Sequence, residues 1–295
     1  MWRKLIKGLI LAAIVLALVI SWAWFFNRTP QIAFDEYGLP SDINTLPQNW
    51  TNDVRQQVAR TSFGSQIMPL AWFLHLERPD QTSLVRDNEH LSTLGFIPQN
   101  FSKNNPHALP LGFSTIQKDG ETWVGLTCPA CHTGLIKYQD QQILIDGGSA
   151  LIHFSAFEQT LLRALEHTLG NEEAFKRFAA KIREQSASTL KARLTRFTQA
   201  FKLRLELNRT QTPYGPGRLD AFGIIFNAVA ASALNNPSNA RPPDAPVSIP
   251  VLWDASHFDV VQWNGSAPNK EPGPLGQNVP TALAVYGDIE MNEGD

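Results

Sequence analysis

The chain has two cysteines, which lie three positions apart with a histidine directly after the second: Cys128-Pro129-Ala130-Cys131-His132. This C-x-x-C-H pattern is the attachment signal for c-type haem. Two thiols in one tight turn can each form a thioether with a haem vinyl group, and the adjacent imidazole then lies where it can bind the iron. The sequence therefore predicts covalent haem c on Cys128 and Cys131, with His132 as the iron ligand. It identifies no catalytic residue.

Three other chemistries could use the same cysteines. A thioredoxin-like dithiol site starts a long helix within the motif, whereas here Thr133 and Gly134 are followed by a β-like stretch. A zinc site needs a second pair of ligands at standard spacing, and a plain disulfide leaves His132 without a role. Haem attachment is favoured over these alternatives.

Composition narrows the class of protein further. A chain of 295 residues can bury a large core without disulfides, and two cysteines exclude a disulfide-rich scaffold. A net charge of −2 argues against a nucleic-acid partner, because such binding requires a basic surplus.

The N-terminus has the pattern of a membrane anchor. Arg3, Lys4 and Lys7 precede a run over residues 9–26 that is apolar apart from one serine, close to the length that spans hydrocarbon. We therefore expect an uncleaved transmembrane helix over residues 1–27, in a single-pass inner-membrane protein whose body faces the periplasm. A cleaved signal peptide is the alternative.

The rest of the chain is expected to form a polar tether over residues 28–60 and one haem domain over residues 61–295. Its pattern predicts a mainly α, cytochrome c-like fold with long irregular loops and a small hairpin behind the anchor. The expected elements are helices over 61–78, about 150–169, 171–208 (broken near Ser186) and 219–234, a loop-like stretch over 95–118, a strand over 123–126, and a hairpin over 135–145.

The second axial position of the iron has no obvious ligand. Met1 lies in the expected anchor, Met291 in an acidic tail, and Met68 upstream of the motif, so a His/Met iron is poorly supported. The other histidines are each more typical of surface or core positions than of iron ligands. An open position walled by apolar side chains suits activation of peroxide or dioxygen.

Two charged features have both structural and functional interpretations. Residues 176–209 hold ten of the 25 basic residues and form either a solvated helix face or a docking surface for an acidic redox partner. Arg218 either pairs with Asp220 at a helix start or binds a haem propionate, since guanidinium groups bind carboxylates bidentately.

Four stretches of the chain resemble the first-haem half of bacterial di-haem cytochrome c peroxidase relatives, especially the rubber-oxygenase-like branch. The likeness covers roughly residues 61–288. It rests on TWVGLTCPACHTG (122–134), IDGG (145–148), YGPGRLDA (214–221) and VQWNGS (261–266).

The resemblance implies that Cys128, Cys131 and His132 form the N-terminal haem site, which in the rubber-oxygenase-like branch meets dioxygen in an apolar, aromatic pocket. It also implies that Trp253 and Ser266 lie near that pocket. These relatives carry a second C-x-x-C-H in a C-terminal domain, and this sequence has no further cysteine. It is therefore either a piece that stops before the second haem or a single-haem derivative.

The expected function is that of a haem-dependent redox protein. It transfers electrons to or from a redox partner protein, or acts as a peroxidase- or dioxygenase-like oxidoreductase on a small oxidant. A haem-based sensor of small gases and a thioredoxin-like dithiol protein are the alternatives. Contact with the membrane is expected through the N-terminal helix.

Overall fold

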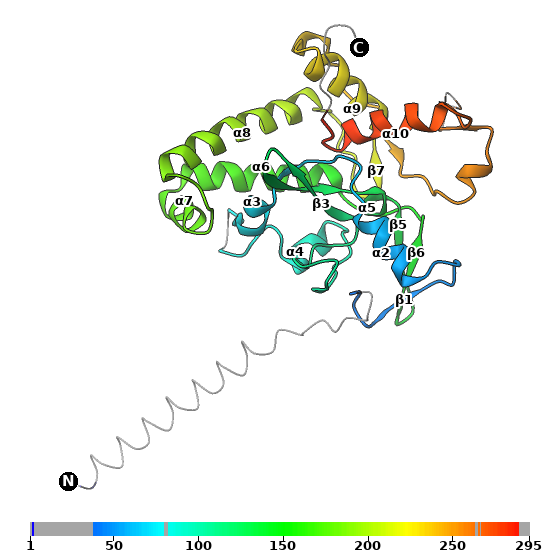
Figure 1. Ribbon diagram of the computed structural model, residues 1–295, viewed down its shortest axis with the longest axis horizontal. Coiled ribbons are helices and arrows are strands. Elements are labelled where there is room, and N and C mark those ends of the chain that lie inside the picture. Colours follow the sequence, from blue (N-terminus) through cyan, green and yellow to red (C-terminus); the bar gives the residue numbers. More distant parts are fainter. Residues whose placement is uncertain (1, 3–37, 80–81, 263–264, 266, 289–295) are drawn as a thin grey trace.

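The computed structural model describes residue 2 and residues 38–79, 82–262, 265 and 267–288. Figure 1 shows that helices α6 (Phe154–Gly170), α7 (Glu172–Ala179) and α8 (Ala187–Leu207) lie together on one side of the molecule, while small sheets lie on the other side. In the sequence, the cysteine motif lies between a strand of one sheet and a strand of another.

The described residues form four small sheets. Two have three strands, in the orders β2-β4-β3 and β1-β6-β5, and two are strand pairs, β7-β8 and β9-β10. The strands are β1 (Ile43–Thr45), β2 (Met68–Pro69), β3 (Phe113–Lys118), β4 (Glu121–Leu126), β5 (Thr133–Tyr138), β6 (Gln141–Asp146), β7 (Arg218–Leu219), β8 (Val247–Ser248), β9 (Val260–Val261) and β10 (Ala267–Pro268).

The hairpin of β3 and β4 leads directly into the motif. Its turn is Asp119-Gly120, with φ angles of 52° and 77°. An Asp-Gly pair with both residues at positive φ fits the tight turn that connects twisted strands. The apolar side chains of Val124 and Leu126 in β4 are buried, so the strand is held in the core just before Cys128.

The helices complete the core around these sheets. They are α2 (Asn52–Arg60), α3 (Leu70–His75), α4 (Asn88–Thr93), α5 (Cys128–Cys131), α6 (Phe154–Gly170), α7 (Glu172–Ala179), α8 (Ala187–Leu207), α9 (Ala221–Asn227), which continues as a π-helix (Ala228–Ala233), and α10 (Gly273–Ala284). Two short 3-10 turns follow Asn236 and Asp254.

Helix α6 illustrates how the core forms. Phe157, Leu161 and Leu165 are four residues apart and fully buried, so they make one apolar stripe along the helix. They belong to the same buried cluster as Trp72 of α3 and Phe201 of α8. Burial of this stripe ties α6 to the helices and the sheet on either side.

The prediction of a mainly α, cytochrome c-like fold is wrong: the protein is mixed α/β, with several sheets. The expected helix over 61–78 shows why. Its apolar spacing suits a helix, but Met68 and Pro69 pair with Val124 and Trp123 as strand β2, and α3 begins only at Leu70. A backbone pairing with a distant strand therefore replaces the local helical preference.

The prediction of a single-pass inner-membrane protein is also corrected. Among the residues that the structure describes, none of the helices combines the length and the apolar character needed to cross a membrane. The expected anchor over residues 1–27 lies, apart from Trp2, outside the described residues. The predicted placement of the body in the periplasm depended on that anchor and is corrected with it.

Candidate functional site

The cysteine motif is held in place from both sides. The backbone N–H of Thr127 donates to the carbonyl of Gly112 at 2.7 Å, and Cys128 to Cys131 form the single helical turn α5. Gly112 has φ +80°, and a Cβ at this position would lie 2.1 Å from the backbone nitrogen of Ala130. Only glycine fits here, so this contact fixes the motif against the loop before β3.

His132 is oriented by a backbone carbonyl far along the chain. Its Nδ1 lies 2.9 Å from the carbonyl oxygen of Pro250. A carbonyl oxygen only accepts, so Nδ1 carries the proton and donates it. Burial lowers the pKa of His132, with the Pro250 hydrogen bond acting in the opposite sense. The imidazole is therefore neutral at pH 7, and its Nε2 keeps a lone pair for a metal.

Both cysteines are free thiols. Burial raises the pKa of Cys128, and burial together with the nearby Cys128 raises the pKa of Cys131 to about 12. Reactive dithiol sites lower the pKa of their attacking cysteine, typically at the start of a long helix. The four-residue α5 and the raised pKa values both disfavour the thioredoxin-like alternative.

A pocket of about 400 Å³ adjoins the motif. Cys128, Pro129 and His132 line one part of it. An apolar side is formed by Trp50, Val58, Leu111, Leu252 and Trp253, and a polar side by Gln48, Arg55, Thr133, Asp146 and Asp254. Ligand and cofactor sites commonly span roughly 300–1,000 Å³ with mostly apolar walls. The sequence motif thus faces a space in the size range of small-molecule sites, with one apolar and one polar side.

Asp146 organises the polar side of this pocket. Its carboxylate accepts a hydrogen bond at 2.7 Å from Nε of Arg55, and both side chains are buried. Its backbone N–H and C=O bind the side-chain amide of Gln48 at 2.8 and 2.9 Å. The indole N–H of Trp253 donates to the same carbonyl at 2.9 Å. One residue therefore holds two walls of the pocket together.

The predicted site residues divide into two groups. The structure brings Cys128, Cys131 and His132 into one turn and places Trp253 in the lining of the same pocket. Arg218 lies elsewhere, exposed in β7 with its guanidinium 3.5 Å from the carbonyl of Pro246. Its expected partner Asp220 instead caps α9 through the N–H of Gly223 at 2.9 Å.

The region around Ser266 is only partly described, because residues 263–264 and 266 lie outside the described residues. The sequence analysis also missed Arg55 and Gln48. Both fall in the expected polar tether, and their only sequence signal is a polar character that loops share.

No other histidine and no methionine lines the pocket within the described chain. The same residues contain no group of three or more His, Cys, Asp or Glu side chains that could hold a metal ion. The prediction of a metal-binding protein is corrected to this extent: the described residues hold no site built from several protein ligands, as the zinc alternative would require. The motif itself offers one imidazole, which is the number of ligands that haem iron needs from it.

Comparisons with known proteins give little functional information. The chain matches no protein-family model and no solved structure. It is 28% identical over 309 aligned positions to the uncharacterized protein y4iJ of Sinorhizobium fredii (strain NBRC 101917 / NGR234), an alignment that covers 94% of this chain and 50% of the relative. The chain therefore spans about half the length of that protein, whose name states no activity.

Proposed function

We propose that this chain is a c-type haem protein, with thioether bonds from Cys128 and Cys131 and with Nε2 of His132 as an iron ligand. The observation that carries the proposal is the bond from Nδ1 of His132 to Pro250 at 2.9 Å. It places the ring proton on Nδ1 and leaves Nε2 free, while burial lowers the pKa of the ring and keeps it neutral at pH 7. This is the arrangement that a metal-binding histidine requires.

The surrounding residues fit such a group. Trp50, Leu252 and Trp253 give the pocket an apolar wall, against which a porphyrin would pack. Arg55 is already neutralised by Asp146, and the other charged side chain of the polar wall, Asp254, is exposed to solvent. Bound haem would supply one-electron exchange, and the chain would hold and shield it.

Electron transfer with a partner protein is the first function that this site supports. A second candidate, an oxidoreductase acting on peroxide or dioxygen, is favoured by one observation: among the described residues, the pocket offers no second histidine or methionine. A gas sensor would share this open position. The resemblance to di-haem cytochrome c peroxidase relatives supports the same chemistry.

Haem attachment can be tested on protein produced together with a c-type haem maturation system. We expect the colour to stay with the polypeptide after extraction with acidified organic solvent and after denaturing electrophoresis. Cys128→Ala with Cys131→Ala should lose it, whereas the exposed His257→Ala should keep it. Colourless native protein would contradict the proposal.

Carbon monoxide separates the candidate functions. Haem iron whose second axial position is occupied by a strong ligand does not bind carbon monoxide. Iron with an open or exchangeable second axial position binds it. Electron transfer alone predicts an unchanged reduced visible spectrum on addition of the gas. A shift, which the lack of a second histidine or methionine among the described lining residues favours, would make the oxidoreductase or the sensor the supported function. An unchanged spectrum would leave electron transfer as the supported function and remove the oxidoreductase and the sensor.

A further inference from the structure

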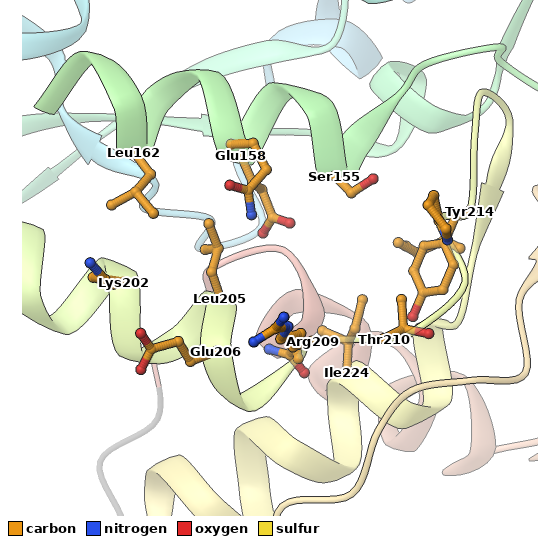
Figure 2. Close-up of a pocket in the computed structure, with 14 residues that line it drawn as sticks. Ser155, Glu158, Leu162, Lys202, Leu205, Glu206, Arg209, Thr210, Tyr214 and Ile224 are labelled. Carbon is orange, nitrogen blue, oxygen red and sulfur yellow. The ribbon is translucent and has the colours of Figure 1, made fainter. Parts of the chain in front are cut away.

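A second cavity, of about 340 Å³, lies between α6, α8 and the segment that follows α8. It shares no lining residue with the pocket at the cysteines. Figure 2 shows Glu158 pointing from α6 into this space, with Leu205 of α8 below it and Arg209 farther along. The cavity therefore combines charged side chains, with Glu158 pointing into it, and aliphatic walls.

The carboxyl group of Glu158 is only partly satisfied by the protein. One oxygen accepts a hydrogen bond of 2.5 Å from the hydroxyl of Tyr286. Among the described residues, no hydrogen bond to the other oxygen is found. An ionised carboxylate in an enclosed site gains much from a charged donor, because the surroundings screen the interaction poorly. The free oxygen is thus a strong acceptor site that faces the cavity.

No cation among the described residues forms an ion pair with Glu158, although the charge of Arg204 acts to lower its pKa. Lys202 is paired with Glu166 at 3.0 Å, which lies outside the cavity lining. Arg204 lies over the ring of Tyr286 at 4.1 Å, and its guanidinium donates to the carbonyl of Ala284 at 2.9 Å. Arg209 is exposed, and its side chain makes no hydrogen bond or ion pair within the described part of the chain.

The remaining walls indicate the shape of a ligand. Leu162, Leu205, Leu219 and Ile224 supply aliphatic surface, and Glu206 adds a second carboxylate at the rim. A primary ammonium provides three donors, and a short alkyl chain would cover the aliphatic walls. The volume is at the lower end of the roughly 300–1,000 Å³ range of small-molecule sites.

We propose that this cavity binds a small aliphatic ammonium ion, with Glu158 as its counter-ion and Leu162, Leu205 and Ile224 as the wall for its alkyl chain. The alternative ligand is an alkyl carboxylate that pairs with Arg209. The exposed Arg209 is solvated by water, so it gains less from an ion than the enclosed Glu158 does. The site is independent of haem attachment.

Three probes of equal chain length test the proposal on the unaltered protein: n-hexylammonium, 1-hexanol and hexanoate. Their binding is measured by calorimetry and by shifts of backbone amide resonances. We expect saturable binding of n-hexylammonium with shifts around Glu158, at least about tenfold weaker binding of 1-hexanol, and none of hexanoate. Hexanoate binding as tightly as the amine, or no saturable amine binding, would overturn the proposal.

Two variants then test the counter-ion. Glu158→Gln keeps an acceptor for Tyr286 and should weaken n-hexylammonium binding about tenfold or more. Arg209→Gln removes a like charge and should strengthen it by a few fold. Glu172→Gln, on the exposed surface of α7, is the matched control and should change nothing. Equal affinity in Glu158→Gln and in the control would refute the assignment even if the cavity binds the amine. If Glu158→Gln fails to fold, the three-probe comparison and Arg209→Gln still decide.

Discussion

Nδ1 of His132 donates a hydrogen bond to the carbonyl oxygen of Pro250, 118 positions farther along the chain. The motif fixes the spacing of two thiols and one imidazole, but this distant carbonyl fixes the tautomer and the direction of the ring. A strong hydrogen bond at Nδ1 makes the imidazole a better electron donor to a metal.

The carbonyl at position 250 should therefore influence the reduction potential of a bound haem. Pro250→Gly loosens the backbone there, and we expect the reduction potential of the attached haem to rise because the imidazole donates less charge. Potentiometric titration followed by visible absorbance measures this. Pro237→Gly, in a separate 3-10 turn, is the control. A potential that falls, or that both variants change equally, would count against this role for Pro250.

The buried ion pair of Arg55 and Asp146 should be strongly sensitive to substitution. Asp146→Asn leaves the Arg55 guanidinium buried without a counter-charge, and breaking such a pair costs about 3–5 kcal/mol. Urea unfolding followed by circular dichroism should show this loss in the free energy of unfolding. Glu166→Gln, which breaks the exposed pair with Lys202, is the comparison and should have little effect. Equal effects of the two would show that the pocket wall does not depend on the Arg55–Asp146 pair.

The haem-free protein should have unreactive thiols at neutral pH. The thiolate is the nucleophile, and a pKa of about 12 for Cys131 leaves about one molecule in a thousand ionised at pH 9. We expect slow alkylation by iodoacetamide that accelerates with pH up to at least pH 10, and fast alkylation of both cysteines in urea. Fast reaction of the folded protein at pH 7 would revive the dithiol alternative.

Glu158 should make the folded state less stable as pH rises. Burial raises the pKa of its carboxyl above the usual 4.5, against smaller opposing contributions from Tyr286 and Arg204. The folded state then binds this proton more tightly than the unfolded state does, so the contribution of Glu158 is lost as pH rises from 4.5 through the raised value.

The test is a comparison of free energies of unfolding between the native chain and Glu158→Gln from pH 4 to pH 8. The native chain should lose stability relative to the variant as pH rises, because glutamine does not titrate. A difference that stays constant with pH, or that changes in the opposite direction, would show that the folded state does not raise this pKa.

The sequence predicted some parts of this structure well. The expected helices near 150–169 and 171–208 appear as α6, α7 and α8, and Ser186, where a break was expected, caps α8. The hairpin of β5 and β6 follows the motif as expected. These elements carry long periodic patterns or a local turn, so neighbouring residues contain the information that specifies them.

Other parts depend on partners far away in the sequence. Strand β1 pairs in parallel with β6, although Ile43 and its neighbours lie in the stretch expected to be a tether. Arg55 acquires its role only through Asp146, 91 positions away. Arg218 was expected either to pair with Asp220 or to bind a haem propionate through its guanidinium group, yet its position in the sequence does not specify its distance from the pocket. The hairpin of β3 and β4 could have been predicted from the sequence, because Asp119-Gly120 is a recognisable turn signal.

Gly112 and Gly120 form a matched pair for testing how the motif is held. Both have positive φ, +80° and +77°, but a Cβ on Gly112 would lie 2.1 Å from the Ala130 nitrogen, whereas nothing lies within 4 Å of a Cβ on Gly120. Gly120→Ala should therefore cost only the backbone strain, about 1–2 kcal/mol.

Gly112→Ala should cost the same strain and also displace α5, because the atoms that it meets are backbone atoms. We expect its free energy of unfolding to fall by at least about 2 kcal/mol more than that of Gly120→Ala. Its yield of covalently attached haem should fall as well, while Gly120→Ala keeps the native yield, because only Gly112 contacts the turn that carries the two thiols. Equal losses in both variants would mean that the loop before β3 does not hold the motif in place.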